Sequence, residues 1–267
     1  MIKKTISTFF VLMLLQINAV NAGSTNEELK GSSESSKECF EGLSRAMFKF
    51  NHTMDKAIFR PVAKGYRSIP APIRKATGNA VNNLRSLLTA SNNILQGDFK
   101  KAGNTAARFG INTTAGVLGF FDPATKLGFE DEGKEDFGQT MGVWGVETGC
   151  YFVLPVLGPT TTRDVVGKVG NVFLDPVYQI THNSEISNGV VGNGNYSEHN
   201  YYYYRGTESV DFRAKNIESF DSVEKNSIDL YASLKSLYLQ NRAKKIINST
   251  STTDTQNDDD WEEIETD

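Results

Sequence analysis

Several residue types and motifs are scarce or missing in this sequence, and their scarcity excludes many functions. The 267 residues include two cysteines and three histidines. No His-x-His, His-Glu-x-x-His or Cys-x-x-Cys motif occurs, so a metal site would have to be assembled from distant residues. Walker A, Gly-x-Ser-x-Gly and strand-linked Gly-x-Gly-x-x-Gly motifs are missing as well. We therefore expect no metal, no cofactor and no enzyme activity, an envelope hydrolase included.

Long runs of a single character are also lacking. No apolar run reaches the roughly 20 residues that a transmembrane helix needs. No basic run with interleaved aromatic residues occurs, so nucleic-acid binding is not expected. Hydrophobic residues make up 39% and charged residues 22% of the chain, which is typical of a globular protein. The net charge of -4 is concentrated at the C-terminus, where the last fourteen residues carry eight acidic side chains and no basic one.

The two ends of the chain differ from its body. Lys3 and Lys4 precede a short apolar stretch and the small residues around Ala22, a pattern typical of a signal peptide that directs export, although an uncleaved anchor is the alternative. Composition then divides the chain into four parts. These are a cleaved signal peptide over residues 1–22, a flexible leader over 23–38, a single helical domain over 39–248 and a disordered acidic tail over 249–267.

Export would place the two cysteines in an oxidising compartment. Cys39 and Cys150 then permit one disulfide, which on the chain-entropy model stabilises by about 4 to 5 kcal/mol because it closes a long loop. Two free or buried thiols are the alternative. Cys39 follows a polar segment and does not directly follow the apolar stretch. A standard lipoprotein anchor is therefore not expected.

Apolar residues recur with helical spacing over most of the body. The clearest helix begins at Phe40 and is expected to stop at Arg60-Pro61. Its apolar stripe fits either the core or a lipid interface. Further helical patterns cover residues 73–96, 98–109 and 210–248. We therefore expect a mostly α-helical fold.

Two uncharged segments interrupt the helical pattern. Residues 110–121 and 148–162 are apolar and punctuated by glycine or proline. Both are too short to span a bilayer as helices, and their length suits re-entrant or interfacial segments, with buried loops as the alternative. The acidic stretch 130–136 lacks the spacing of an EF-hand and is interpreted as a solvated loop. The four tyrosines at 201–204 suit a membrane interface, or a strand or helix edge.

Short blocks follow one another through the body in a recognisable order. They are Arg45-Ala-Met-Phe-Lys-Phe-Asn51, Arg60-Pro-Val-Ala63, Tyr66, Ile69-Pro70, Asn93-Ile-Leu-Gln-Gly97, Arg108-Phe109, Asn112-Thr113, Gly116, Gly119, Asp122, Glu135-Asp-Phe-Gly-Gln-Thr140, Gly142, Trp144-Gly145, Leu154-Pro155, Gly158-Pro159 and Arg163-Asp164. The blocks cover about residues 40–178. Together they closely resemble the MlaA/VacJ family of Gram-negative outer-membrane proteins.

The resemblance implies a ring-like, membrane-associated helical body at the inner leaflet of the outer membrane. Family members remove mislocalised phospholipids from the outer leaflet through a central amphipathic channel. They pass the lipid to a periplasmic carrier protein for retrograde transport to the inner membrane, and they commonly associate with trimeric porins. The direction of transport rests on the resemblance alone.

Two departures from the family pattern bear on these expectations. Family members are typically lipoproteins, and the lipid-attachment cysteine is not found here, which shifts membrane attachment onto the amphipathic body. Cys150 stands before Tyr151, where a proline is usual. This change turns a disulfide with Cys39 into a testable hypothesis.

A transported phospholipid needs an apolar surface for its tails and a polar path for its head group, because desolvating the head group is costly. We expect lipid contact from Phe109, Val117, Leu118, Phe120, Phe121, Trp144, Tyr151 and Leu154, and a polar pore wall at Asn112 and Thr113. Core packing of the same segments is the alternative. Two other functions stay open, a soluble periplasmic lipid carrier and a structural or host-interaction protein that docks through its acidic tail.

Overall fold

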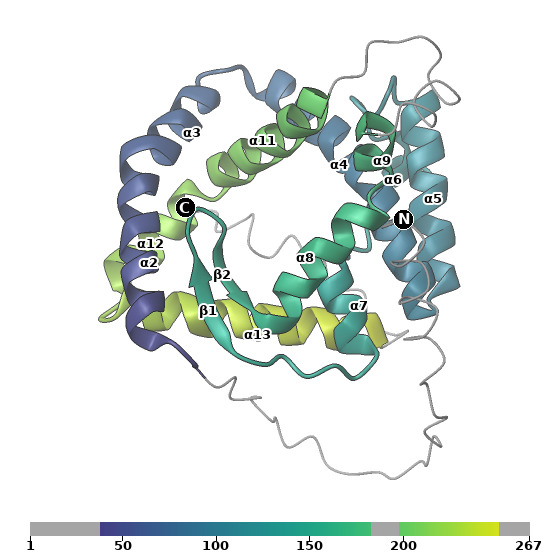
Figure 1. Ribbon diagram of the computed structural model, residues 1–267. Coiled ribbons are helices and arrows are strands. Elements are labelled where there is room, and N and C mark those ends of the chain that lie inside the picture. Colours follow the sequence, from purple (N-terminus) through teal and green to yellow (C-terminus); the bar gives the residue numbers. More distant parts are fainter. Residues whose placement is uncertain (1–37, 183–197, 251–267) are drawn as a thin grey trace. The chain divides into compact units, whose positions relative to one another are not determined.

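The computed structural model describes residues 38–182 and 198–250, all within one compact unit, Glu34–Asp267 (Figure 1). The expected signal peptide, nearly all of the expected leader and most of the expected acidic tail lie outside the described residues. The prediction of a mostly helical fold is confirmed. In chain order the elements are α2 (Glu41–Met54), the π-helical turn η1 (Asp55–Phe59), α3 (Arg60–Arg67), α4 (Ala71–Gln96), α5 (Phe99–Thr114), α6 (Pro123–Lys126), α7 (Phe137–Val143), β1 (Tyr151–Leu154), β2 (Gly158–Thr161), α8 (Thr162–Leu174), α9 (Pro176–His182), α11 (Glu198–Lys215), α12 (Ile217–Asn226) and α13 (Leu230–Thr250).

The elements contact one another in a closed circuit. α2 continues through η1 into α3, α3 packs on α11, α11 on α4, α4 on α7, and α7 on α13. The β1–β2 hairpin closes the circuit because β1 contacts α2 and β2 contacts α13. Figure 1 shows the resulting ring, with α5 packed along α4. The expected ring-like arrangement is therefore present.

The first helix does not stop at Arg60-Pro61, so that prediction is wrong. The turn before the proline is π-helical, and the Arg60 N–H donates to the Asp55 carbonyl five residues earlier. Pro61 then lies in the first turn of α3, the part of a helix that tolerates proline best. The helical path therefore continues to Arg67.

The second apolar segment forms a hairpin, whereas the sequence predicted a re-entrant or interfacial segment or a buried loop. β1 and β2 pair antiparallel, from Tyr151 opposite Thr161 to Leu154 opposite Gly158. Alternate residues of β1 are buried, as a strand with one face on the core requires. Strands of four residues carry too few alternations to stand out from helical spacing.

The segment before α2 fastens the ring at the hairpin and α13. Cys39 and Cys150 form a disulfide with their Cα atoms 5.6 Å apart. Glu38 pairs with Tyr151 in a parallel bridge. Its carboxylate accepts hydrogen bonds from the hydroxyl of Tyr231 and, at 2.5 Å, from Nζ of Lys235 on α13. One short segment therefore joins three elements of the circuit.

The interior of the ring wall is polar to an unusual degree. Asn92, Gln139 and Thr140 are among the largest fully buried side chains. The buried apolar clusters are small, namely Ala63, Ala214 and Ile217 in one and Tyr151, Val153 and Tyr231 in the other. Many large apolar side chains instead lie exposed on the surface. Exposed apolar surface of this extent is typical of contact with an apolar partner.

The stripe on the first helix follows this inverted pattern. Leu43, Phe50 and Ile58 are exposed, and only Met47 packs against an apolar cluster. The core interpretation of the stripe is therefore wrong for most of its members. Within residues 38–182 and 198–250, no helix combines the length and the apolar character needed to cross a bilayer.

Candidate functional site

The loop after α5 carries an apolar tip with unusual backbone geometry. Val117, Leu118 and Gly119 are three consecutive residues in the left-handed region, with φ of 53°, 58° and 86°. This region is costly for a β-branched residue such as valine. The loop amides are nevertheless satisfied, because Leu118 N donates to Thr113 O at 2.9 Å and Gly119 N donates to Asn112 O at 2.8 Å. Hydrogen bonds to the end of α5 therefore hold the strained tip in place.

Asparagines of α4 fix the other side of this loop. Asn83 Nδ2 donates to Thr113 Oγ1 at 2.8 Å, and Asn79 Nδ2 donates to the Phe120 carbonyl at 3.2 Å. A Cβ atom on Gly119 would lie 2.6 Å from Cβ of Asn83, so only glycine fits against α4. The loop has a polar base against α4 and an apolar tip.

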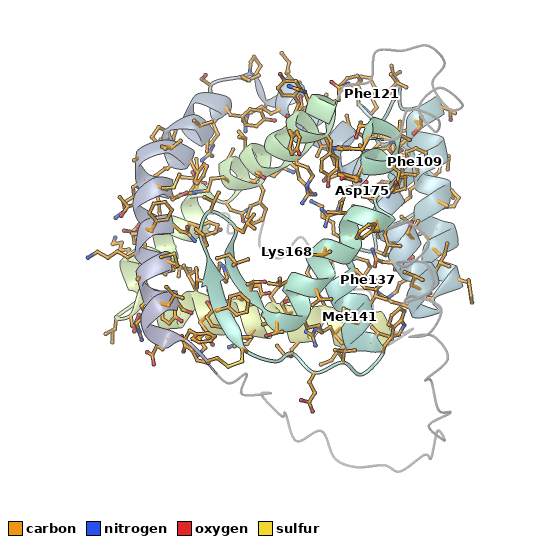
Figure 2. All side chains as sticks on the ribbon, in the orientation of Figure 1. Phe109, Phe121, Phe137, Met141, Lys168 and Asp175 are labelled. Carbon is orange, nitrogen blue, oxygen red and sulfur yellow. A yellow bond between two sulfur atoms is a disulfide. The ribbon has the colours of Figure 1, made fainter. Side chains whose placement is uncertain are left out.

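The side chains at the tip point away from the core. Leu118 is 68% and Phe121 63% exposed, and Val117 and Phe120 are exposed as well. Figure 2 shows Phe121 at the rim of the ring and Phe109 on α5. Phe109 is half-buried. Four of the expected lipid-contacting residues therefore share one exposed surface.

Two further expected contact residues lie elsewhere on the ring. Trp144, after α7, is exposed, and its Nε1 donates to the Leu95 carbonyl at 2.9 Å. Its ring meets Phe137 edge-on with 5.7 Å between centroids. Leu154, at the end of β1, is half-buried. The structure does not bring these residues together with the loop tip.

Two expected site residues are committed to the fold. Tyr151 is 1% exposed and packs in the apolar cluster with Tyr231, so it offers no lipid surface. Asn112 is 7% exposed; its amide donates to Asp122 Oδ1 at 2.9 Å and accepts from Ala124 N at 3.1 Å. We therefore no longer expect Tyr151 to contact lipid or Asn112 to line a polar pore wall. Thr113 is half-buried and accepts from Asn83, so it also supports the loop.

The hairpin turn presents a second apolar tip that sequence reasoning missed. Val156 has φ of 66°, and it and Leu157 are exposed, Leu157 to 65%. Asn51 on α2 donates to the Leu154 carbonyl at 2.8 Å and accepts from Val156 N at 2.7 Å. As in the first loop, an asparagine holds a strained turn that exposes aliphatic side chains. The signal available in the sequence was a pair of aliphatic residues between two prolines, at 155 and 159.

One side of α8 packs against α7 through glycines. A Cβ atom on Gly167 would lie 2.5 Å from the backbone N of Gly138, and one on Gly170 would collide with the Phe137 ring. The two helices therefore approach more closely than larger residues allow. This contact fixes which side of α8 stays open.

The open side of α8 is amphipathic. Val166, Val169 and Phe173 share one edge of that side at helical spacing, and all three are exposed. Lys168 lies on the other edge, and Figure 2 shows it toward the middle of the ring. Desolvation by the surrounding protein lowers the pKa of Lys168. The spacing of the apolar residues was visible in the sequence, but their exposure was not.

Among the described residues, no group of three or more His, Cys, Asp or Glu side chains is arranged to hold a metal ion. The features that distinguish this surface are the two exposed apolar tips, after α5 and in the hairpin turn, and the open side of α8 with its apolar edge and Lys168. This combination suits an amphipathic ligand.

Comparisons with known proteins agree on one family. Residues 36–245 match the family model described as MlaA lipoprotein. The intermembrane phospholipid transport system lipoprotein MlaA of Haemophilus influenzae is 31% identical over 87% of this chain and 88% of its own length. The protein of the same name from Escherichia coli is 30% identical over 75% of this chain and 74% of its own. An uncharacterised protein of Rickettsia felis is 36% identical over 74% and 73% of the two chains.

A solved structure gives the same result. It concerns the structural basis for maintenance of bacterial outer membrane lipid asymmetry, and one of its chains is 28% identical to this one. The superposition has a TM-score of 0.65 and covers 79% of this chain and 99% of the other. The chain belongs to the MlaA lipoprotein family.

Proposed function

We propose that this chain transports phospholipid and thereby maintains the lipid asymmetry of the outer membrane. The observation that carries the proposal is the open side of α8, where exposed apolar residues share one edge and Lys168, on the other edge, lies toward the middle of the ring. The naming of relatives as phospholipid transport lipoproteins supports the same function.

The chemistry of the path follows from the two halves of a phospholipid. Val166, Val169 and Phe173 offer an apolar surface to the acyl tails. Lys168 offers a positive charge to the phosphate, so the head group keeps a polar partner and avoids the cost of full desolvation. The exposed tips at Leu118 and Leu157 would contact the membrane where lipid enters.

We also propose the location and the direction of transport that the family resemblance implies. The ring lies at the periplasmic side of the outer membrane, takes phospholipids mislocalised to the outer leaflet and passes them to a periplasmic carrier protein for retrograde transport. It associates with a trimeric porin. Exposed apolar residues such as Phe50 and Ile58 provide membrane contact.

The test measures phospholipid on the cell surface. In cells lacking the gene, phospholipid accessible to an added phospholipase should rise, and the wild-type gene should reverse the rise. Val169→Asp places a charge on the apolar edge of α8 and should fail to complement. Ile228→Asp, at a fully exposed position between α12 and α13, is the matched control and should complement. Unchanged accessibility in the deletion strain, with the protein soluble after fractionation, would favour a periplasmic carrier instead.

A further inference from the structure

A cluster of charged residues lies where α4, α11 and the α8–α9 junction meet. Arg85 on α4 and Arg205 on α11 both bind the carboxylate of Glu208, with N–O distances of 3.3 and 2.5 Å. Asp175, between α8 and α9, interacts electrostatically with both arginines. A single close carboxylate therefore serves two guanidinium groups.

Two hydrogen-bond donors in this cluster are buried without a partner. Nε of Arg85 and the hydroxyl of Tyr204 are both shielded from solvent and unpaired. Tyr204 is only 8% exposed, so its hydroxyl cannot turn to bulk water. Native proteins rarely leave such groups unsatisfied unless a ligand or a special role explains them.

A further basic side chain lies near these donors. Lys134 adds a third basic group to the two arginines. Desolvation and repulsion by Arg85 lower the pKa of Lys134, whereas attraction by Glu208 raises it. Burial raises the pKa of the Asp175 carboxyl, and a backbone hydrogen bond from Val177 and attraction by the two arginines oppose this rise. Glu208 is shared between two arginines, so the unpaired donors of Arg85 and Tyr204 are open to an anionic ligand.

We propose that Arg85, Arg205 and Tyr204 bind the phosphate of a phospholipid head group. This inference rests on the proposed function and names the place where the head group is held. Guanidinium groups match phosphate oxygens through paired N–H donors, and the tyrosine hydroxyl supplies a further donor. Glu208 holds the two arginines in position. The oxygens of a phosphodiester are acceptors for the two donors that are unpaired in the structure.

The experiment uses the purified full chain and dihexanoyl phosphatidylglycerol below its micellar concentration, with binding measured by calorimetry. Arg85→Gln and Arg205→Gln should each weaken binding about tenfold, because each removes a hydrogen bond to a charged group. Tyr204→Phe keeps the ring and should weaken binding about fivefold. Arg67→Gln, which removes an arginine paired with Glu218 between α3 and α12, is the matched control and should bind as the wild type does.

Each other outcome has a definite meaning. Equal binding by the wild type and both glutamine variants would overturn the inference and leave the proposed function standing. A wild type that binds no phospholipid would overturn both. Inorganic phosphate that binds as tightly as the lipid, with the same dependence on the arginines, would overturn the assignment to a lipid head group. If the glutamine variants do not fold, Tyr204→Phe decides, and its unchanged binding would count against the site.

Discussion

Arg242 donates two hydrogen bonds to the carboxylate of Asp136, at 2.6 and 3.0 Å, across 106 residues of sequence. The same guanidinium donates to Asp164 at 2.6 Å. One side chain of α13 therefore holds the start of α7 and the start of α8. All three charged groups are largely buried, and Asp164 is also contacted by Arg163 and by the Tyr238 hydroxyl.

Removal of Arg242 should destabilise the protein strongly. Arg242→Met would leave the buried Asp136 without this cation and Asp164 with Arg163 at 3.7 Å, and we expect the free energy of unfolding to fall by about 3–5 kcal/mol. Urea unfolding measures the loss. Arg45→Met is the control, since its partners Glu41 and Asp229 are exposed and the expected loss is about 0–1 kcal/mol. Equal losses in the two variants would contradict the proposed role of the buried network.

The Asp136 carboxyl should make stability depend on pH in acid. Burial alone would raise its pKa, but attraction and hydrogen bonds from Arg242 outweigh burial and hold it well below its ordinary range. A lowered pKa stabilises the fold above the unfolded-state pKa of about 3.9, and this stabilisation is lost as the pH falls further. The unfolding free energy of the wild type should therefore decrease below about pH 4, and Asp136→Asn should show a shallower decrease. Parallel profiles for the two proteins would argue against this assignment.

The loop after α5 should depend on glycine at position 119 for two reasons. Gly119→Ala introduces a Cβ at positive φ and places it 2.6 Å from Asn83. Gly128→Ala is a matched control, because Gly128 has φ of +85° but open space around it. Both should lose about 1 kcal/mol for the backbone, and Gly119→Ala about 1–3 kcal/mol more for the collision. Thermal unfolding measures both, and indistinguishable losses would show that α4 does not constrain the loop.

The disulfide should be present in the exported protein and should stabilise it. Removal of both sulfurs by Cys39→Ser and Cys150→Ser should lower the free energy of unfolding by about 4 to 5 kcal/mol, because residues 39 and 150 enclose a long loop. Mass spectrometry under non-reducing conditions should find neither thiol available for alkylation. Two alkylated thiols in native protein would dispose of the bond.

Much of the helical fold could be predicted from apolar spacing, because each helix reports its own period locally. The course of the chain at Pro61 could not be predicted, since a π-helical turn is not visible in side-chain spacing. The hairpin was hidden because its strands have four residues each. Local patterns therefore predicted the helices and missed the hairpin and the π-helical turn.

The candidate site was less accessible to sequence reasoning. Leu118 and Phe121 were expected at a lipid surface and are exposed, but Tyr151 is core. The spacing of a short apolar segment does not say which of its residues face inward. The Arg85 and Arg205 cluster depends on the meeting of helices 120 residues apart, which no local pattern encodes.

The disulfide between Cys39 and Cys150 also restricts how the ring can open. A ring of packed elements can open at any contact between neighbouring elements that no covalent bond bridges. The seam where the segment before α2 meets the start of the hairpin is bridged, so it stays shut unless the bond is reduced. Opening of the oxidised ring is therefore confined to its other contacts. One of these is the contact between α3 and α11, which is held by non-covalent packing.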